Sequence, residues 1–131
     1  MNRRVVNPWT WQDAFGFVQA HEVTGAGRIL HCAGQASVDE NGAPLYPGDM
    51  VAQANQALDN LEQVLDEAGL TIAAVTRLNY YVTDVDAFFA AAEQVLPRVA
   101  GKGCRPASTL LGVQRLAFPD LMIEIEATAI T

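Results

Sequence analysis

The chain has 131 residues, half of them hydrophobic and 18% charged, with a formal net charge of −7. This length predicts a single domain, 1–131, with enough apolar residues for a core. The eight Lys and Arg residues are scattered along an acidic chain. This argues against nucleic acid and anionic membranes as partners, because both attract clustered cations. No apolar stretch is long enough to span a bilayer and no signal-peptide pattern opens the sequence, so a cytoplasmic protein is expected.

Two runs of β-forming residues come first, Phe15–Val23 and Gly27–Gln35. The glycine-bearing turn Thr24–Gly27 between them predicts a β-hairpin. In that hairpin His21 and His31 fall nearly opposite each other, as a pair that binds a metal or titrates near neutral pH would. Because the spacing places no third ligand, we interpret them as ordinary strand histidines and expect no metal site.

The two cysteines have no CxxC partner. Cys32 directly follows His31, and adjacent strand residues point to opposite faces, so these two side chains cannot form a nucleophile pair. Cys104 lies far away in the sequence. We therefore interpret both as buried, reduced thiols.

The clearest element is a helix that follows the loop 36–48, is capped by Asp49, and runs to Ala68 before Gly69. Its main apolar line steps by three and four residues, as one buried stripe of a helix does. Its polar residues, Gln53 among them, fall elsewhere on the cylinder. The apolar line consists of Val51, Ala54, Leu58, Leu61, Leu65 and Ala68, with Val64 beside it.

The second half of the chain predicts three strands and another helix. This helix is capped by Asp84 or Asp86, and Pro97 inside it is expected to kink or break it. On the last strand, alternation places Ile123, Ile125, Ala127 and Ala129 on one face. The strands are Thr76–Val82, Ser108–Val113 and Met122–Thr131.

The element order β-β-α-β-α-β-β predicts an α+β fold in which two helices cover one face of a sheet. Tyr81, Leu111 and Val113 suggest that the other face is apolar as well. An uncovered apolar sheet face is a surface for self-association, so a homo-oligomer is expected.

Three charged residues are candidates for chemistry. Glu124 and Glu126 share one face of the last strand. In one interpretation these two carboxylates carry out acid–base chemistry. In the other they form the polar face of a strand that points to solvent or to a subunit boundary. Arg105, just before Pro106, either forks onto a ligand carboxylate or lies at the surface. Composition and periodicity leave these alternatives open.

Several pieces of the sequence, taken together and in this order, resemble the RidA (YjgF) family along nearly the whole chain. They are Cys32–Gln35, Ala52–Ala54, Asp59–Leu61, Leu65–Gly69, Tyr81–Asp84, Arg105–Ala107, Gly112–Leu116 and Ile123–Ala127.

This resemblance implies a chorismate-mutase-like fold, with one mixed sheet and two helices on one face. It also implies a homotrimer with small-molecule clefts between its subunits. Members of the family hydrolyse enamines and imines formed from amino acids, such as 2-aminoacrylate, to keto acids and ammonia without a cofactor. Older descriptions of relatives as endoribonucleases or translation inhibitors fit an acidic chain less well.

The resemblance also implies which residues bind a ligand. Glu124 matches the cleft carboxylate that positions or activates water, and Gly34 matches backbone that frames the cleft. Ser108 stands where deaminating members have an arginine for the substrate carboxylate, and serine cannot form that two-pronged, charge-assisted clamp. Phe17 and Ala33 stand where Tyr and Ser are common. The implied cleft is therefore more apolar and less anion-seeking than that of the deaminases.

Arg105 is a poor substitute for that arginine within one subunit, because it lies three residues before Ser108 and points to the other side of an extended chain. Two functions remain open. The protein is a hydrolase of an imine, an enamine or a related small molecule with an altered substrate, or it is a non-catalytic metabolite-binding or interaction protein of the same fold.

Overall fold

A computed structural model describes all 131 residues of the chain. Seven strands and two α-helices follow one another, with two short 3-10 segments between them. The elements are β1 (Asn2–Val6), η1 (Trp11–Phe15), β2 (Ala20–Thr24), β3 (Ile29–His31), β4 (Gln35–Ala36), α1 (Met50–Glu67), η2 (Ile72–Ala74), β5 (Val75–Val82), α2 (Val85–Gly101), β6 (Ala107–Gly112) and β7 (Ile123–Ile130).

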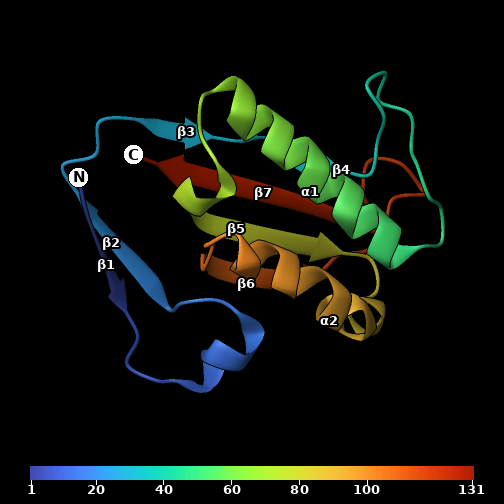
Figure 1. Ribbon diagram of the computed structural model, residues 1–131. Helices are drawn as coiled ribbons and strands as arrows, with labels where there is room; N and C mark the ends of the chain where they lie inside the picture. Colours follow the sequence, from blue (N-terminus) through green and yellow to red (C-terminus); the bar gives the residue numbers. More distant parts are fainter.

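The main sheet has five strands in the order β3-β7-β5-β6, with β4 also paired to β7. β5 and β6 are parallel and the other pairs are antiparallel, so the sheet is mixed. Both helices lie on the same face of this sheet (Figure 1). The α+β fold expected from the element order is therefore confirmed.

The core lies between the two helices and the sheet. Helix α1 begins where expected, since the Asp49 carboxylate accepts a hydrogen bond from the Ala52 N–H at 3.0 Å. It ends before Gly69, which has the positive φ of 74° that glycine tolerates best. Leu61, in the middle of the apolar line, is fully buried, and β7 alternates buried and half-buried residues along its whole length.

Gln53 is an exception to the expected facing of α1, because it is fully buried. Its Nε2 donates to the carbonyls of Tyr46 and Asp120 at 3.1 and 2.7 Å, and its Oε1 accepts from the Met122 N–H at 2.8 Å. A polar side chain is stable in a core when every hydrogen-bonding group is satisfied in this way. Gln53 thus ties the loop that precedes helix α1 to the segment that precedes strand β7.

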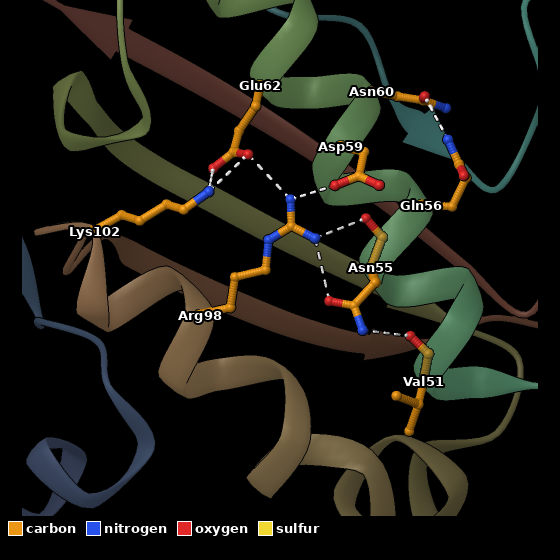
Figure 2. Close-up of polar contacts among 8 residues, drawn as sticks. All are labelled: Val51, Asn55, Gln56, Asp59, Asn60, Glu62, Arg98 and Lys102. Carbon is orange, nitrogen blue, oxygen red and sulfur yellow. Dashed lines mark hydrogen bonds and ion pairs between the residues drawn. The ribbon is translucent and has the colours of Figure 1, made fainter.

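Polar side chains join the two helices on their outer sides (Figure 2). Arg98 of α2 donates to Asp59 at 2.5 Å and to Glu62 at 3.0 Å, and Lys102 binds the same Glu62 carboxylate at 2.6 Å. Arg98 also donates to the backbone and side-chain oxygens of Asn55. These contacts fix α2 against α1, and α2 forms one wall of the cavity described below.

The predicted N-terminal hairpin is wrong. β2 pairs with β1, a strand that the sequence did not reveal, and together they form a separate two-stranded ribbon beside the main sheet (Figure 1). β3 instead pairs with β7. The turn fails to close because the N–H groups of Gly27 and Arg28 both donate to the Thr131 carbonyl, which draws the chain to the C-terminal strand. The strand expected over Phe15–Val23 begins only at Ala20, and Phe15 closes the 3-10 segment η1 instead.

Helix α2 is capped by Asp84, whose carboxylate accepts from the Ala87 N–H at 2.9 Å. It continues through Pro97 to Gly101, so the expected break is absent. Proline removes only the hydrogen bond to the carbonyl four residues earlier, that of Glu93, which belongs to an exposed residue. Neither helix combines the length and apolarity that crossing a bilayer requires.

The sheet face away from the helices is more polar than the sequence suggested. Leu111 and Tyr81 lie on this face, and Ile29 pairs with Ile130 at its β3 edge, but the residues between them are hydrogen-bonding ones. One polar atom there, Asn79 Oδ1, is buried without a hydrogen-bond partner. By strand register the face also carries His31, Arg77, Thr109, Glu124, Glu126 and Thr128.

Candidate functional site

A cavity of about 770 Å³ opens between η1, helix α2 and strand β6. Twelve of its 18 lining residues are hydrophobic, so its walls are mainly apolar. Among the expected site residues, Phe17 and Ser108 both line it. Trp11, Tyr80, Phe88 and Phe89 contribute further aromatic rings to its walls.

Strand register explains why Ser108 faces this cavity. In the parallel pair of β5 and β6, Ser108 lies beside Leu78 and Leu110 beside Tyr80, and both β5 residues are buried on the helix side. Paired strand residues point to the same face, so Ser108 also points to the helix side. Its hydroxyl donates to the Leu78 carbonyl at 2.5 Å.

Phe17 reaches the cavity because the chain beside it extends the sheet. Val18 forms a parallel bridge to Ala107, and its N–H donates to the Pro106 carbonyl at 2.9 Å. The preceding η1 segment is held by buried Gln12, whose Nε2 donates to the Trp9 carbonyl at 2.9 Å. The ring of Phe17 then packs edge-on against Trp11, with centroids 5.7 Å apart.

Arg105 lies at the rim and does not line the cavity. Its guanidinium forms an ion pair with Asp13 at 3.1 Å, and both side chains are half-exposed. Its backbone carbonyl lies 2.8 Å from His21 Nε2. The charged residues that do line the cavity are Asp13 and Glu93, which are both acidic.

The remaining expected residues, Ala33, Gly34 and Glu124, meet at another place. Gly34 passes directly against the Glu124 side chain. A Cβ atom built at position 34 would overlap the carboxylate and lie 2.8 Å from its Cδ. Only glycine leaves room for this approach. The Glu124 side chain makes no hydrogen bond or ion pair within the chain, and Ala33 and Gly34 are exposed beside it.

The two groups do not touch the same space within one chain. Strand β5 separates β6, which bears Ser108, from β7, which bears Glu124. Neighbouring strands are ~5 Å apart. The two side chains also point to opposite faces of the sheet. Glu124 pairs with Tyr81 and Ser108 pairs with Leu78, and these two β5 residues lie on opposite faces because they are three positions apart. A small molecule bound to one subunit contacts one group only.

Glu126 shares the strand face of Glu124 but differs in its surroundings. Tyr81 and Asn79 both donate hydrogen bonds to Glu126 Oε1. These bonds, the one from Tyr81 first, lower the pKa of Glu126 and hold it as a carboxylate. Of the two strand carboxylates, Glu124 is therefore the one free to act on a ligand.

The histidines do not form a pair. His21 contacts Arg3, while His31 lies opposite Thr128 in the main sheet. Burial and then the positive charge of Arg3 lower the pKa of His21, despite the hydrogen bond to the Arg105 carbonyl. No three His, Cys, Asp or Glu side chains lie close enough together to hold a metal ion.

Both cysteines are free thiols. Cys104 is buried, as expected, and burial raises its pKa to about 11. Cys32 is half-buried, and burial raises its pKa as well. Such thiols are weak nucleophiles at neutral pH.

Sequence reasoning missed the aromatic walls of the cavity. Trp11, Tyr80, Phe88 and Phe89 come from η1, β5 and α2, which only tertiary packing brings together. The available signal was the density of aromatic residues at Trp9–Phe17, where four rings lie within one short segment.

Comparison with known proteins gives consistent matches. The family model described as endoribonuclease L-PSP matches residues 12–131. A RutC family protein of Pyrococcus horikoshii is 34% identical over 104 residues, which are 79% of this chain and 80% of that protein.

Solved structures agree. The Rid-family protein YyfB from Yersinia pestis is 43% identical, with a TM-score of 0.86 and full coverage of both chains. TdcF from E. coli, crystallised with bound serine, is 26% identical, with a TM-score of 0.69 over 88% of this chain and 87% of that one. The matching family model and these relatives together show that the chain described here belongs to the Rid (YjgF/RutC) family.

Proposed function

We propose that this protein is a cofactor-free hydrolase of C=N bonds in imines or enamines, acting in clefts between the subunits of a homotrimer. The observation that carries this proposal is the Glu124 carboxylate, which lies unpaired against the exposed Gly34 backbone. An unpaired carboxylate beside open backbone is suited to bind and polarise a water molecule.

A cleft between subunits would unite the two groups of site residues. Phe17 and Ser108 of one subunit would face Ala33, Gly34 and Glu124 of the next. Phe17, Ser108 and Glu124 are partly exposed, and Ala33 and Gly34 are exposed, so both groups can be reached from outside their own chain, as a composite site requires. The buried, unpartnered Asn79 Oδ1 also favours an oligomer, since a donor from another subunit would satisfy it.

The reaction needs only water. Glu124 takes a proton from the water, whose oxygen forms a bond to the imine carbon. The π electrons of the C=N bond move to the nitrogen, which takes the proton back from Glu124. The new hydroxyl group then passes its proton, through Glu124, to this amine nitrogen. The C–N bond breaks, its electron pair leaves with ammonia, and a lone pair of the oxygen forms the C=O bond of the carbonyl product. No oxidant or reductant is involved, in keeping with a site built from one carboxylate and backbone.

Ser108 sets the substrate apart from those of the deaminating relatives. Its hydroxyl is engaged with the Leu78 carbonyl, and no cation lines the cavity. A charge-assisted hydrogen bond contributes about 1.5–3 kcal/mol. We therefore expect activity on 2-aminoacrylate to be at least ~10- to 100-fold below that of an arginine-bearing site.

Introducing Ser108→Arg should raise kcat/KM on 2-aminoacrylate, and adding Glu124→Gln should lower it again. The assay generates the enamine with a dehydratase and follows its loss against the spontaneous rate. Robust activity of the unmodified protein would contradict the role given to Ser108 and would point to a cation such as Arg105 of a neighbouring subunit.

The test of the function itself is ammonia release from a panel of imines with and without carboxylates. Glu124→Gln should reduce the rate by about 10²-fold or more, whereas Glu126→Gln, on the same strand face, should leave most of it. If no imine is hydrolysed above the spontaneous rate, the hydrolase proposal is wrong. The non-catalytic, ligand-binding function then becomes the better account, for which the serine bound to TdcF is the precedent.

A further inference from the structure

The size, walls and charges of the cavity beside β6 restrict the chemical class of ligand that can bind there. We infer, resting on the proposed hydrolase function, that this cavity binds the aromatic or similarly bulky apolar group of an imine that carries no carboxylate, with the Tyr80 hydroxyl as its polar anchor.

The size and walls of the cavity suit such a group. Its volume of about 770 Å³ lies within the range of small-molecule pockets. Trp11 packs edge-on against Phe17, and Tyr80 lies against Phe88 with ring centroids 5.3 Å apart. Rings held in this way can contact a planar ligand with their edges and faces. This arrangement favours the binding of an aromatic ligand over that of a short polar one.

The charges around the cavity oppose an anion. Asp13 and Glu93 are the charged lining residues, and Glu93 has no ion-pair partner. Arg105 is turned to Asp13 at the rim and does not face the interior. A ligand carboxylate in this cavity would lose its hydration without gaining a cation, and it would be repelled by the Glu93 carboxylate. Both effects disfavour the binding of an anion.

Tyr80 supplies the second observation. Its side chain is only 6% exposed and lines the cavity, and its hydroxyl has no hydrogen-bond partner in the chain. The one buried side-chain polar atom without a partner is Asn79 Oδ1, so the Tyr80 hydroxyl is not sealed in the core and is accessible from the cavity. Burial raises the pKa of Tyr80, so it remains a phenol that can donate.

Ser108 cannot play the same part. Its proton is already given to the Leu78 carbonyl, so it presents only lone pairs to the cavity. The Tyr80 O–H is thus a donor that this wall leaves for a ligand, and it suits one neutral acceptor such as an imine nitrogen or a carbonyl oxygen. A reaction that oxidises a primary amine to its imine would supply a substrate of this class.

The test compares two product-like ligands that share a phenyl group. Phenylacetone and phenylpyruvate differ in having a methyl group or a carboxylate next to the carbonyl. Binding to the full-length protein is followed by tryptophan fluorescence, because Trp11 lines the cavity. We expect phenylacetone to bind at least ~10-fold more tightly than phenylpyruvate. Equal or tighter binding of phenylpyruvate would overturn the inference.

Variants locate the binding. Ala92→Trp, which fills the cavity from α2, should abolish phenylacetone binding, and Tyr80→Phe should weaken it by about threefold to tenfold. If Tyr80→Phe does not fold, Phe89→Ala, which removes a half-exposed wall, should also weaken binding. Unchanged affinity in Ala92→Trp would overturn the inference.

Glu124→Gln separates this inference from the proposed function. It should keep phenylacetone binding while losing ammonia release. Binding without hydrolysis of any imine would overturn the hydrolase proposal alone and leave the ligand class of the cavity standing. Hydrolysis of imines without phenylacetone binding would overturn the cavity inference alone.

Discussion

Glycine at position 34 allows the backbone between β3 and β4 to pass directly against the Glu124 carboxylate. The glycine and the glutamate come from distant parts of the chain, so their contact was not visible in the spacing. The resemblance to a family suggested both residues, and the fold brings them together. Ser108 and Phe17 meet for the same reason, since Val18 and Ala107 are bridged. Site residues of this kind follow from tertiary pairing and not from local pattern.

Gly34→Ala should displace the Glu124 carboxylate and reduce imine hydrolysis by at least ~10-fold, with little change in melting temperature because Gly34 is exposed. The matched control is Gly101→Ala at the end of α2, where nothing lies within 4 Å of an added Cβ. Its activity and melting temperature should both stay near those of the unmodified protein. Full activity of Gly34→Ala would mean that Glu124 does not need its present position.

Leu61→Ala should lower the free energy of unfolding by about 2–5 kcal/mol, because the side chain is fully buried and its removal leaves a cavity. Val64→Ala on the same helix is the control, since Val64 is 37% exposed, and should cost less than about 1 kcal/mol. Urea denaturation of both variants measures the difference. A loss below about 0.5 kcal/mol for Leu61→Ala would contradict the facing of α1.

At the scale of elements, the sequence predicted the helices and strands that have a strong hydrophobic periodicity. Helix α1 and strands β5 and β7 appear within a residue or two of the expected bounds. The choice of strand partners was beyond local pattern, because Gly27 and Arg28 bond to Thr131 at the far end of the chain. The facing of β6 was equally hidden, since Leu110 and Leu111 are both apolar. Buried Gln53 looks like a surface residue until its partners are known.

The contact between α1 and α2 should weaken in acid. Burial disfavours the charged form of Glu62, but hydrogen bonds from Lys102 and Arg98 outweigh it, so the pKa of Glu62 lies below its ordinary value of 4.5. A carboxylate with a lowered folded pKa stabilises fully above its unfolded pKa. This stabilisation is lost as the pH falls through the folded value.

Glu62→Gln should therefore cost about 1 kcal/mol at pH 7, and this difference from the unmodified protein should shrink as the pH is lowered below about 4.5. Urea denaturation between pH 7 and pH 3 measures it. Glu67→Gln, an exposed position on α1 without an ion pair, is the control and should show no such dependence. A difference that stays constant across this range would contradict the ionic role of Glu62.

At the scale of the whole molecule, the site residues form two groups on opposite faces of one sheet. The sequence suggested self-association through an apolar sheet face, but that face is largely polar, with Arg77, Asn79 and Glu126 among its residues. An oligomer joined there would rely on hydrogen bonds as well as on the apolar side chains of this face, which are Tyr81, Leu111, Ile29 and Ile130. Light scattering coupled to size exclusion should report three chain masses, and a monomer at micromolar concentration would contradict the proposed trimer.

The central claim is that each active site combines Phe17 and Ser108 of one subunit with Gly34 and Glu124 of another. Mixing two inactive variants tests it most directly. Ala92→Trp blocks the cavity and Glu124→Gln removes the base, so each homotrimer should be inactive. When equal amounts of the two variants assemble at random, about a quarter of all sites pair an intact cavity with an intact Glu124, so about a quarter of the unmodified activity should return. If mixed trimers are present by native mass spectrometry and the activity is no greater than that of the separate variants, the composite site is wrong.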